Sequence, residues 1–440
     1  MPETAENCGG RIEEIVCADR ISALPEDLLV TILLDVPIND AVTTMVLSKR
    51  WRFIWTMLPK LEYKENNDNE RQKSVWWFLD KSLELHKAPV LQMLFIELGP
   101  QCPSDADVEK CVAKAVDRRV IFLRLGLLWS ADPTSLPKTL YSCESLKILH
   151  LSDKILVDVP STNCLPSLRW LYLNRVIYKN EDSLIRFLSS CPVLKSLLVK
   201  RKKKDNVKKF TVKVPSLLVL IYTNYSYVED TGRCLVVDTP ALKDFDISDY
   251  SGDSCSIENT PCLNKVHIDV YNWSFPDIDK FLRYFSRVLF LELFLTDEMI
   301  VCWRTIKFSR LKKCKIFPCD SDWMDSLLCF LQNTPKLKFL IVDYKLTNEP
   351  PYASTSWSES SSDPECLSSS LEKFELIDYT GRQEEKELVA YILTTSRCLK
   401  TATISLRSLP DLKLEEKATM IEELKAIPRV SITSQLLFKT

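Results

Sequence analysis

One apolar pattern, L-x-x-L-x-L with conservative apolar substitutions, recurs thirteen times between residue 91 and the C-terminal region. Its first positions are Leu91, Val120, Leu146, Leu168, Leu194, Leu217, Leu242, Leu263, Val288, Leu311, Leu337, Leu371 and Leu399. The mean step is about 26 residues, inside the 20–29 range of leucine-rich repeats. A unit of one short strand and one helix cannot bury its apolar face alone. The chain is therefore constrained to stack its units into a solenoid.

This repeat predicts an α/β fold: an irregular leucine-rich-repeat solenoid of about 13 strand units, with the repeats over residues 91–349. We expect the leucines to point into the stack and the residues between them to lie on the concave face, because side chains alternate along a strand. Helical spacing of apolar residues predicts helices at residues 182–190, 276–286 and 323–332. The asparagine or cysteine expected after the last leucine is mostly missing, so the curvature should be irregular.

Residues 20–61 have a different pattern, which predicts a small helical head after a short polar leader at residues 1–19. Its first helix begins at Leu24-Pro25-Glu26-Asp27, because proline and acidic residues suit the first helical turn. Apolar side chains then recur at helical spacing at Leu28, Leu29, Ile32 and Leu33. About forty residues is near or below the size at which a lone apolar core holds a domain. The head should therefore pack on the rest of the chain or on a partner.

Several short runs of the head share their order and spacing with a known module. They are Leu24-Pro25, Leu28-Leu29, Ile32-Leu33, Asp40-Ala41-Val42 and the run from Val46 to Arg52. On these residues the head resembles the plant F-box, which docks on the Skp-type adaptor of a cullin–RING ubiquitin ligase. Matched to that motif, the resemblance implies an adaptor-binding surface of Leu24, Pro25, Leu28, Ile32, Leu33, Leu47 and Trp51. In this interpretation Trp51 fills an apolar pocket of the adaptor.

Two segments outside the head and repeats have distinct compositions. Residues 62–90 begin with a charged stretch that lacks apolar periodicity, so we expect a linker there, followed by a helix from Ser74 to Leu85. Residues 350–370 hold nine serines and begin with two prolines. This composition predicts a loop that lengthens one repeat.

The C-terminal residues 371–440 continue the apolar pattern and add helical segments. They include the run from Ser370 to Leu376, the run from Cys398 to Ile404 and a helix near 415–426. On these runs the segment resembles the FBD module found at the C-terminus of plant F-box repeat proteins. Physically, such a module would serve as the end cap that hides the last apolar face of a solenoid.

The composition argues against most enzymatic chemistry. Seven glycines occur where average usage of about 7% predicts roughly 31, and no phosphate-cradling glycine motif is present. Three histidines lie far apart, and the sixteen cysteines form no Cys-x-x-Cys pair, so we expect no metal site, no cofactor and no catalytic residues. Scattered cysteines favour a reducing compartment, cytoplasmic or nuclear. No run of about 18 apolar residues indicates a membrane span.

The strongest local charge lies in residues 200–209, KRKKKDNVKK, where seven of ten residues are basic. Such a run is typical of a nuclear-import signal or an RNA-binding patch, but also of a solvated loop between repeats. No aromatic residues interleave with the lysines, and the net charge of the chain is −2. Both observations argue against nucleic acid as a partner.

The concave face is the more favourable place for a protein client. By strand phase, Arg169, Trp170 and Tyr172 should project outward together, beside Ile148 and His150. Aromatic and arginine side chains are the usual carriers of interface energy. Taken with the F-box resemblance, this predicts a non-catalytic substrate receptor of a ubiquitin ligase. A repeat scaffold without ligase recruitment and a small-molecule receptor remain as alternatives.

Overall fold

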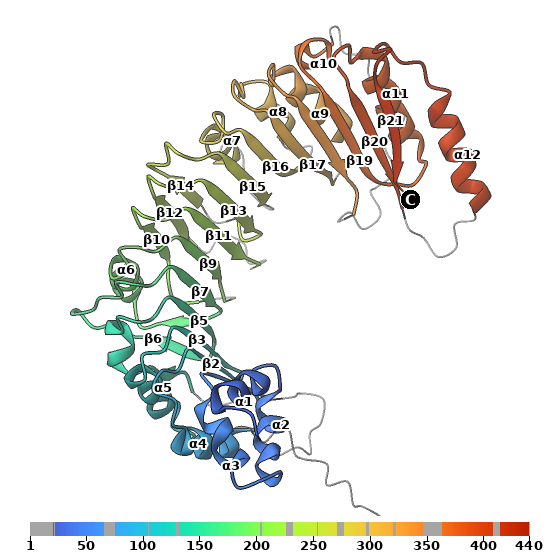
Figure 1. The fold of residues 1–440 in the computed structure, drawn as a ribbon. Coiled ribbons are helices and arrows are strands. Elements are labelled where there is room, and N and C mark those ends of the chain that lie inside the picture. The colour runs from blue at the N-terminus through green and yellow to red at the C-terminus, as the bar shows by residue number, and fades with distance from the viewer. Residues whose placement is uncertain are drawn as a thin grey trace, which may run out of the picture.

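We describe the protein from a computed structural model of the 440-residue chain. The structure describes residues 21, 23–65, 75–103, 105–128, 132–202, 205–225, 232–252, 254–270, 277–295, 299–319, 323–345, 363–407 and 414–439. The expected leader at 1–19 and most of the expected serine-rich loop lie outside these residues. Within them the chain forms an arc, with a helical head at its N-terminal end (Figure 1).

A single parallel sheet of fifteen strands lines the inner side of the arc (Figure 1). Its strands, in spatial order, are β1 (Lys60–Lys64), β2 (Met93–Leu98), β3 (Phe122–Leu127), β5 (Ile148–Asp153), β7 (Trp170–Asn174), β9 (Ser196–Lys200), β11 (Val219–Asn224), β13 (Asp244–Asp249), β15 (Lys265–Val270), β16 (Phe290–Leu295), β17 (Lys313–Pro318), β18 (Phe339–Asp343), β19 (Lys373–Tyr379), β20 (Thr401–Leu406) and β21 (Gln435–Lys439). Each of the thirteen predicted repeats begins two residues before a strand. The solenoid prediction is therefore confirmed, and β1 and β21 extend it at its two ends.

The outer side of the arc carries helices at both ends and short strands in the middle (Figure 1). The helices are α4 (Trp76–Leu85), α5 (Val108–Asp117), α6 (Glu181–Ser189), α7 (Asp277–Arg283), α8 (Ile300–Trp303), α9 (Trp323–Gln332), α10 (Glu365–Ser369), α11 (Gln383–Thr395) and α12 (Leu414–Lys425), with the 3₁₀ turn η3 (Lys138–Ser142). The outer strands form two sheets, one of β4 (Thr134–Ser135), β6 (Ile155–Val157) and β8 (Ile177–Tyr178), the other of β10 (Lys209–Lys213), β12 (Cys234–Asp238) and β14 (Ser254–Ile257). The predicted helices at 182–190, 276–286 and 323–332 are confirmed as α6, α7 and α9.

One expected loop is partly a helix. Residues 365–369 fall in the serine-rich segment 350–370, yet they form α10. Pro364 precedes the first helical turn, where its missing N–H costs nothing. Cys366 and Leu367 are buried in the core of the solenoid, which holds this turn in place. The apolar pair outweighs the loop preference of the serines around it.

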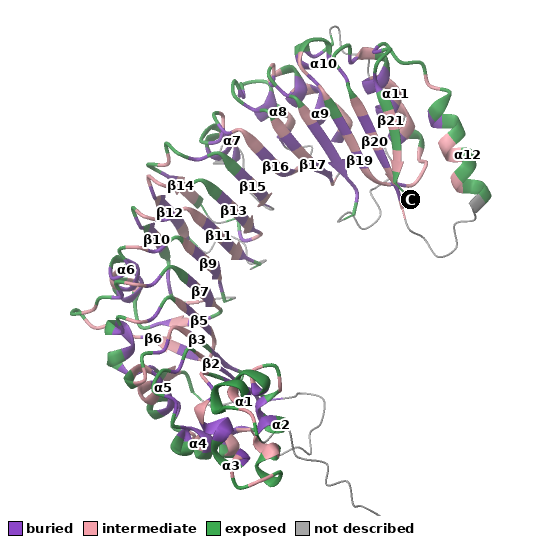
Figure 2. Cartoon of the chain, viewed as in Figure 1, coloured by how far each residue is buried: buried purple, intermediate pink, exposed green. Residues whose placement is uncertain are grey.

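A single apolar core runs through the whole molecule, from Leu29 in the head to Leu424 in α12 (Figure 2). The head consists of α1 (Glu26–Leu33), α2 (Ile38–Thr43), η1 (Thr44–Val46), α3 (Trp51–Ile54) and η2 (Trp55–Met57). Its last turn is joined to the body by backbone hydrogen bonds, because the carbonyl of Thr56 accepts from the N–H groups of Lys87 and Ala88. The head is therefore the N-terminal cap of the solenoid rather than a tethered domain.

The C-terminal end is closed by α11 and α12. The buried carboxylate of Glu385 accepts hydrogen bonds from the backbone N–H groups of Thr380, Gly381 and Arg382, which satisfies donors at the start of α11. Gly381 has a φ of +85°, and a Cβ there would lie 3.0 Å from the Cε of Met420 in α12. The positive φ favours glycine at the turn, and a larger residue would also require the flexible Met420 side chain to shift.

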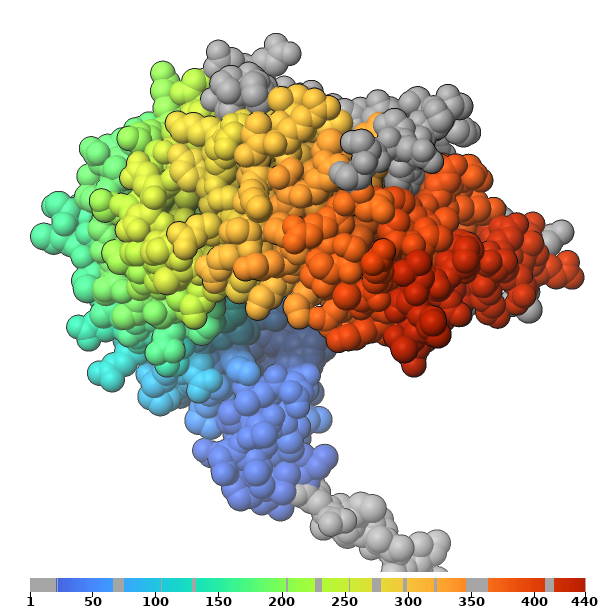
Figure 3. Space-filling model, turned by 90° about the horizontal axis from the view of Figure 1, so that it is seen from above, coloured from blue at the N-terminus to red at the C-terminus, as the bar shows by residue number. Residues whose placement is uncertain are grey.

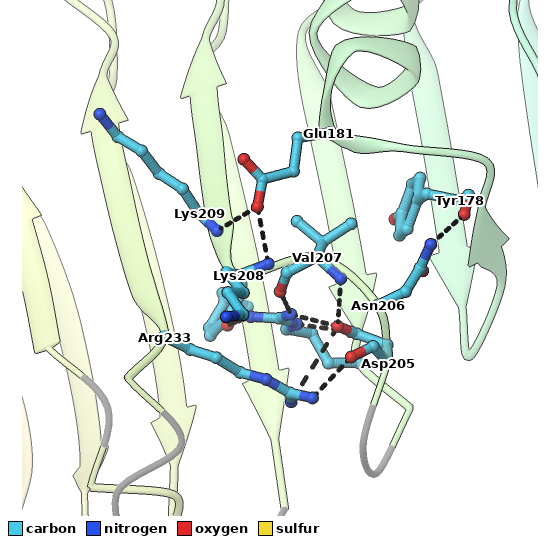
Figure 4. Close-up of polar contacts among 10 residues, drawn as sticks. Tyr178, Glu181, Asp205, Asn206, Val207, Lys208, Lys209 and Arg233 are labelled. Atoms are coloured by element: carbon cyan, nitrogen blue, oxygen red, sulfur yellow. Dashed lines mark hydrogen bonds and ion pairs between the residues drawn. The ribbon is translucent and has the colours of Figure 1, made fainter.

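The basic run at residues 200–209 is partly interior rather than a solvated loop. The side chains of Arg201 and Asp205 are only about 1% and 2% exposed, and Arg201 Nε lies 2.7 Å from Asp205 Oδ2. Arg201 also donates to the Tyr222 hydroxyl, and Arg233 donates to the backbone carbonyl of Asp205 at 2.6 Å (Figure 4). Lys203 and Lys204 lie outside the described residues.

The same segment is anchored to α6 from outside. Glu181 Oε1 accepts from the backbone N–H groups of Lys208 and Lys209 at 2.9 Å each (Figure 4). The side chains of these two lysines remain exposed. Residues 200–209 therefore combine a buried polar anchor, which fixes the return from β9 to β10, with lysines that face solvent.

This anchor generates a stability prediction. Replacing Asp205 by Asn leaves Arg201 buried without its counter-charge, and we expect a loss of about 3–5 kcal/mol in the free energy of unfolding. The matched control is Asp158→Asn, which removes the exposed ion pair with Lys179 at 2.9 Å and should cost at most about 1 kcal/mol. Urea denaturation of both variants measures the difference. Equal destabilisation would contradict a structural role for the buried pair.

Candidate functional site

The head exposes an apolar patch to solvent. We call head patch the exposed apolar side chains of α1 and of the segment that follows α2, namely Leu28, Ile32, Met45, Val46 and Leu47. Leu28 and Ile32 are 46% and 45% exposed, and they lie on neighbouring turns of α1. Pro25 is also exposed and Leu24 is half-buried. Several exposed large apolar side chains on so small a head favour a contact with another protein.

Two of the residues that the F-box resemblance implied lie elsewhere. Leu33 is 2% exposed and Trp51 is 3% exposed, because both pack in the core of the head. The reason is helical phase: Leu29 and Leu33 share the inward side of α1, which leaves Leu28 and Ile32 outside. Trp51 thus fills an apolar pocket of its own chain in this structure. The assignment of the remaining residues to adaptor binding stays a prediction.

Met45 and Val46 were missed as surface residues. They belong to η1, a 3₁₀ turn that follows α2 directly, and Val46 is 83% exposed. Helical periodicity expects apolar residues to point inward, and it cannot indicate that a tightened turn places this pair outside. The available signal was their place at the start of the matched run, which begins at Val46 and which Met45 directly precedes.

The head projects from the end of the arc as a separate protrusion in the space-filling view (Figure 3). The head is nevertheless connected to the body by a polar joint around His86. The His86 ring lies with Nε2 2.7 Å from the carbonyl oxygen of Leu58 and Nδ1 2.6 Å from a guanidinium nitrogen of Arg118.

These contacts define the protonation state of His86. Arg118 is a donor only, so Nδ1 accepts and Nε2 carries the proton that is donated to Leu58. Burial is the main reason why the pKa of His86 lies below its ordinary value of 6.5, and the charge of Arg118 lowers it further. The neutral ring therefore holds the last turn of the head against α4 and the loop that follows α5.

The second candidate surface lies on the concave face over β5 and β7. Ile148 pairs in register with Trp170, and His150 with Tyr172, so the four predicted side chains form two neighbouring rows. The His150 and Tyr172 rings meet edge-on with centroids 5.3 Å apart, and Trp170 is 44% exposed. Arg169 is exposed just before β7. The structure thus brings the five predicted residues together, and client binding by them stays a prediction.

The aromatic row extends further toward the head than predicted. The Phe122 ring in β3 lies 5.2 Å from the His150 ring, and the Arg124 guanidinium lies 4.5 Å from the Phe95 ring of β2. Phe122 occupies the same repeat position as Trp170, and Phe95 and Arg124 occupy that of Tyr172, in the units of β2 and β3, which precede the unit of β5. Comparing equivalent positions of all repeats, rather than the clearest copies alone, would have found them.

Other kinds of site have little support in the described parts of the chain. These residues contain no group of three or more His, Cys, Asp or Glu placed to hold a metal ion. Among their helices, none has the length and apolar character that crossing a bilayer requires. A hollow of about 340 Å³ lies beside the Asp153–Arg175 ion pair, and one of about 280 Å³ beside His267.

The fold and the head together define a class: leucine-rich-repeat proteins with an N-terminal F-box. The F-box domain model matches residues 21–63, and the FBD model matches residues 359–404. A model of the repeats of the FBD-associated F-box protein At5g56370 matches residues 108–269.

Full-length relatives narrow this class. The chain is 56% identical to the FBD-associated F-box protein At1g05080 of Arabidopsis thaliana, over 98% of this chain and 99% of that protein. It is 46% identical to the F-box/FBD/LRR-repeat protein At1g22000 of the same plant, over 100% of this chain and 94% of that protein. It is 37% identical to the F-box/FBD/LRR-repeat protein At4g26340 of the same plant, over 96% and 100%. The chain belongs to the F-box/FBD/LRR-repeat family.

The joint at His86 predicts a pH dependence. The pKa of this ring is lowered in the folded chain, so below pH 6.5 the unfolded state binds a proton that the folded state does not. Its contribution to stability is therefore complete above pH 6.5 and is lost as the pH falls. We expect His86→Gln, which keeps a donor for Leu58, to lose less stability than the wild type between pH 7.5 and 5.5. Urea midpoints at the two pH values measure this, and parallel losses would contradict it.

Proposed function

We propose that this chain is the substrate-recognition subunit of an SCF-type cullin–RING ubiquitin ligase. In this proposal the F-box head docks on the Skp-type adaptor, and the repeats hold a protein client for ubiquitination by other subunits. One observation carries the proposal. The head already shares the apolar core of the solenoid, yet Leu28, Ile32 and Val46 remain exposed on its outer surface. An apolar patch that the chain's own fold leaves uncovered favours a partner that covers it.

Such a subunit acts by bringing the client close to the enzyme that transfers ubiquitin. The chain offers positions for binding, and the transfer of ubiquitin is performed by other subunits, so we assign it no catalytic residue. Holding a client lysine near the charged conjugating enzyme raises the effective concentration of the two reactants. The setting that fits this role is the cytoplasm or the nucleus. We propose no nucleic acid, membrane or cofactor as a partner.

The concave aromatic row is the proposed client site. Trp170 presents a large, partly exposed ring, and Tyr172 is held beside it by the edge-on contact with His150. Rings that are fixed by their neighbours lose little side-chain entropy when a partner binds. Phe122, from the row of Ile148 and Trp170, contacts the His150 ring, so a client would meet adjoining aromatic rings on three strands.

Adaptor binding can be tested on the head patch with a close control. Ile32→Asp places a charge in the proposed interface, and we expect adaptor affinity to fall by tenfold or more, about 1.4 kcal/mol or greater. Ile185→Asp on α6 changes an isoleucine of the same 45% exposure far from the head, and binding should stay unchanged. Co-purification and calorimetric titration with the adaptor measure both. If the Ile32 variant kept full affinity, the chain would be a repeat scaffold instead.

Client binding can be tested on the concave face. Trp170→Ala combined with Tyr172→Ala removes two partly exposed rings, so the fold and adaptor binding should be retained. Ubiquitinated proteins that depend on the wild-type chain in plant cells should be lost with this variant, as measured by quantitative mass spectrometry. Tyr284→Ala combined with Val301→Ala, two exposed positions on the helical side, should leave them unchanged. If the dependent ubiquitinated proteins were lost with both double variants, or with neither, the Trp170 and Tyr172 rings would be excluded as the client site.

A further inference from the structure

A ladder of alternating lysine and phenylalanine side chains crosses the concave face at the far end of the arc from the head. We call lysine–phenylalanine ladder the row of Lys265, Phe290, Lys313, Phe339 and Lys373. These residues occupy the first position of five successive strands, β15 to β19, and are neighbours in register (Figure 1). The row is separate from the aromatic row over β3, β5 and β7.

The lysines of the ladder contact the phenylalanine rings. The Lys313 ammonium lies 4.9 Å from the centroids of both the Phe290 and the Phe339 ring. Lys265 lies 5.4 Å from Phe290 on the other side, and Lys373 lies 6.0 Å from Phe339. Each ring is thus flanked by two ammonium groups, which are attracted to its faces and held in one line.

The ladder lysines make no close ion pair with carboxylates of the described residues. Lys265, Lys313 and Lys373 form no ion pair among the parts of the chain that the structure describes. The neighbouring row of the same strands is different. There Lys315 lies 2.9 Å from Asp343 and 3.5 Å from Glu292, and Glu375 is paired with Lys439. Glu292, Asp343 and Glu375 therefore have cations of their own, which leaves the charge of Lys313 and Lys373 available. At the other end of the ladder, Asp244 of β13 is the register neighbour of Lys265 and partly offsets its charge.

We propose that the ladder is a binding site for an acidic, extended segment of a protein partner. The three lysine side chains are held against phenylalanine rings before a partner binds. They therefore present a line of positive charge and lose little further side-chain entropy on binding. Client carboxylates would bind the ammonium groups, and apolar client side chains would cover the exposed ring edges. This inference rests on the proposed receptor function, and it specifies an acidic client segment as the chemistry that the receptor would bind.

The geometry indicates a spacing for this segment. Strands in a sheet lie about 4.8 Å apart, so lysines on alternate strands are separated by roughly 9.6 Å. An extended peptide advances about 3.3 Å per residue, and three residues cover the same distance. A segment that crosses the strands would place acidic side chains on all three lysines if they recurred at about every third position.

The surroundings favour a peptide over nucleic acid. The faces of Phe290 and Phe339 are occupied by lysine, so they are not free to stack on bases. Asp246, Glu292 and Glu375 line the neighbouring row and would lie against a phosphate backbone. A peptide can present its carboxylates to the ladder alone, whereas the phosphates of a nucleic acid strand are continuous.

The test uses the full chain in complex with its adaptor and a fluorescent peptide of three Glu-Ser-Leu units. The wild type should bind this peptide at least tenfold more tightly than the same peptide with Gln in place of Glu. The variant K265Q/K313Q/K373Q should lose that preference. The control K110Q/K280Q/K307Q removes three exposed lysines from the helices and loops of the body and should keep it. Fluorescence anisotropy at 50 and 150 mM salt measures the binding of both peptides to each of the three proteins.

The outcomes are separable. Thermal unfolding shows whether the ladder variant is folded; if it is not, K265Q/K373Q keeps the central Lys313 and should still lose most of the preference. Three outcomes would overturn the proposal. They are an equal loss of the preference for the Glu peptide in the control variant, no such preference in the wild type, or a uridine oligonucleotide that binds more tightly than the peptide and depends on the ladder lysines. Adaptor binding is measured in parallel, so that failure of the ladder is distinguished from failure of the ligase role. The variant W170A/Y172A should retain peptide binding.

Discussion

The stacking of short parallel strands on one another is the constraint on which the rest of this structure depends. Each repeat contributes a few leucines to the interior and three outward positions to the concave face, and register places these outward positions in continuous rows. The apolar interior is shared from the head to α12, so a repeat has no stable core of its own. The concave aromatic surface and the lysine–phenylalanine ladder both result from this stacking, because side chains far apart in sequence become neighbours on adjacent strands.

The sequence predicts the body well and the head only in part. Every predicted repeat begins two residues before a strand, since strand phase needs only a period of two and a regular interval. On a short amphipathic helix, by contrast, Leu28 and Leu29 are equivalent by composition, and only packing decides which one is exposed. The same limit applies to Trp51, whose place in the motif does not tell whether it faces a partner or the interior of its own head.

Local polar composition was the least informative signal. The run at residues 200–209 has the composition of a solvated loop, yet Arg201 is buried because Asp205, Tyr222 and Val207 satisfy its guanidinium group. Asp205 and Val207 lie in the same run, but it is the fold of the segment between β9 and β10 that brings them onto the guanidinium group, and Tyr222 lies 21 residues away. The composition of the run alone therefore does not indicate that the charge is buried. The ladder was missed for a related reason: its lysines are ordinary in each strand and become distinctive only when five strands are aligned.

The hydrogen bonds between Thr56 and the residues that follow α4 join the head to the arc through the backbone. A flexible tether would let a bound cargo sweep a wide volume around the enzyme that modifies it. In the proposed receptor role, a head joined in this way would instead fix the angle and the distance between the adaptor and the bound client. Lysines of the cargo that lie within that fixed radius would be modified, and equally accessible ones outside it would be spared. Selectivity among acceptor lysines would then come from geometry at the Thr56 junction as well as from recognition.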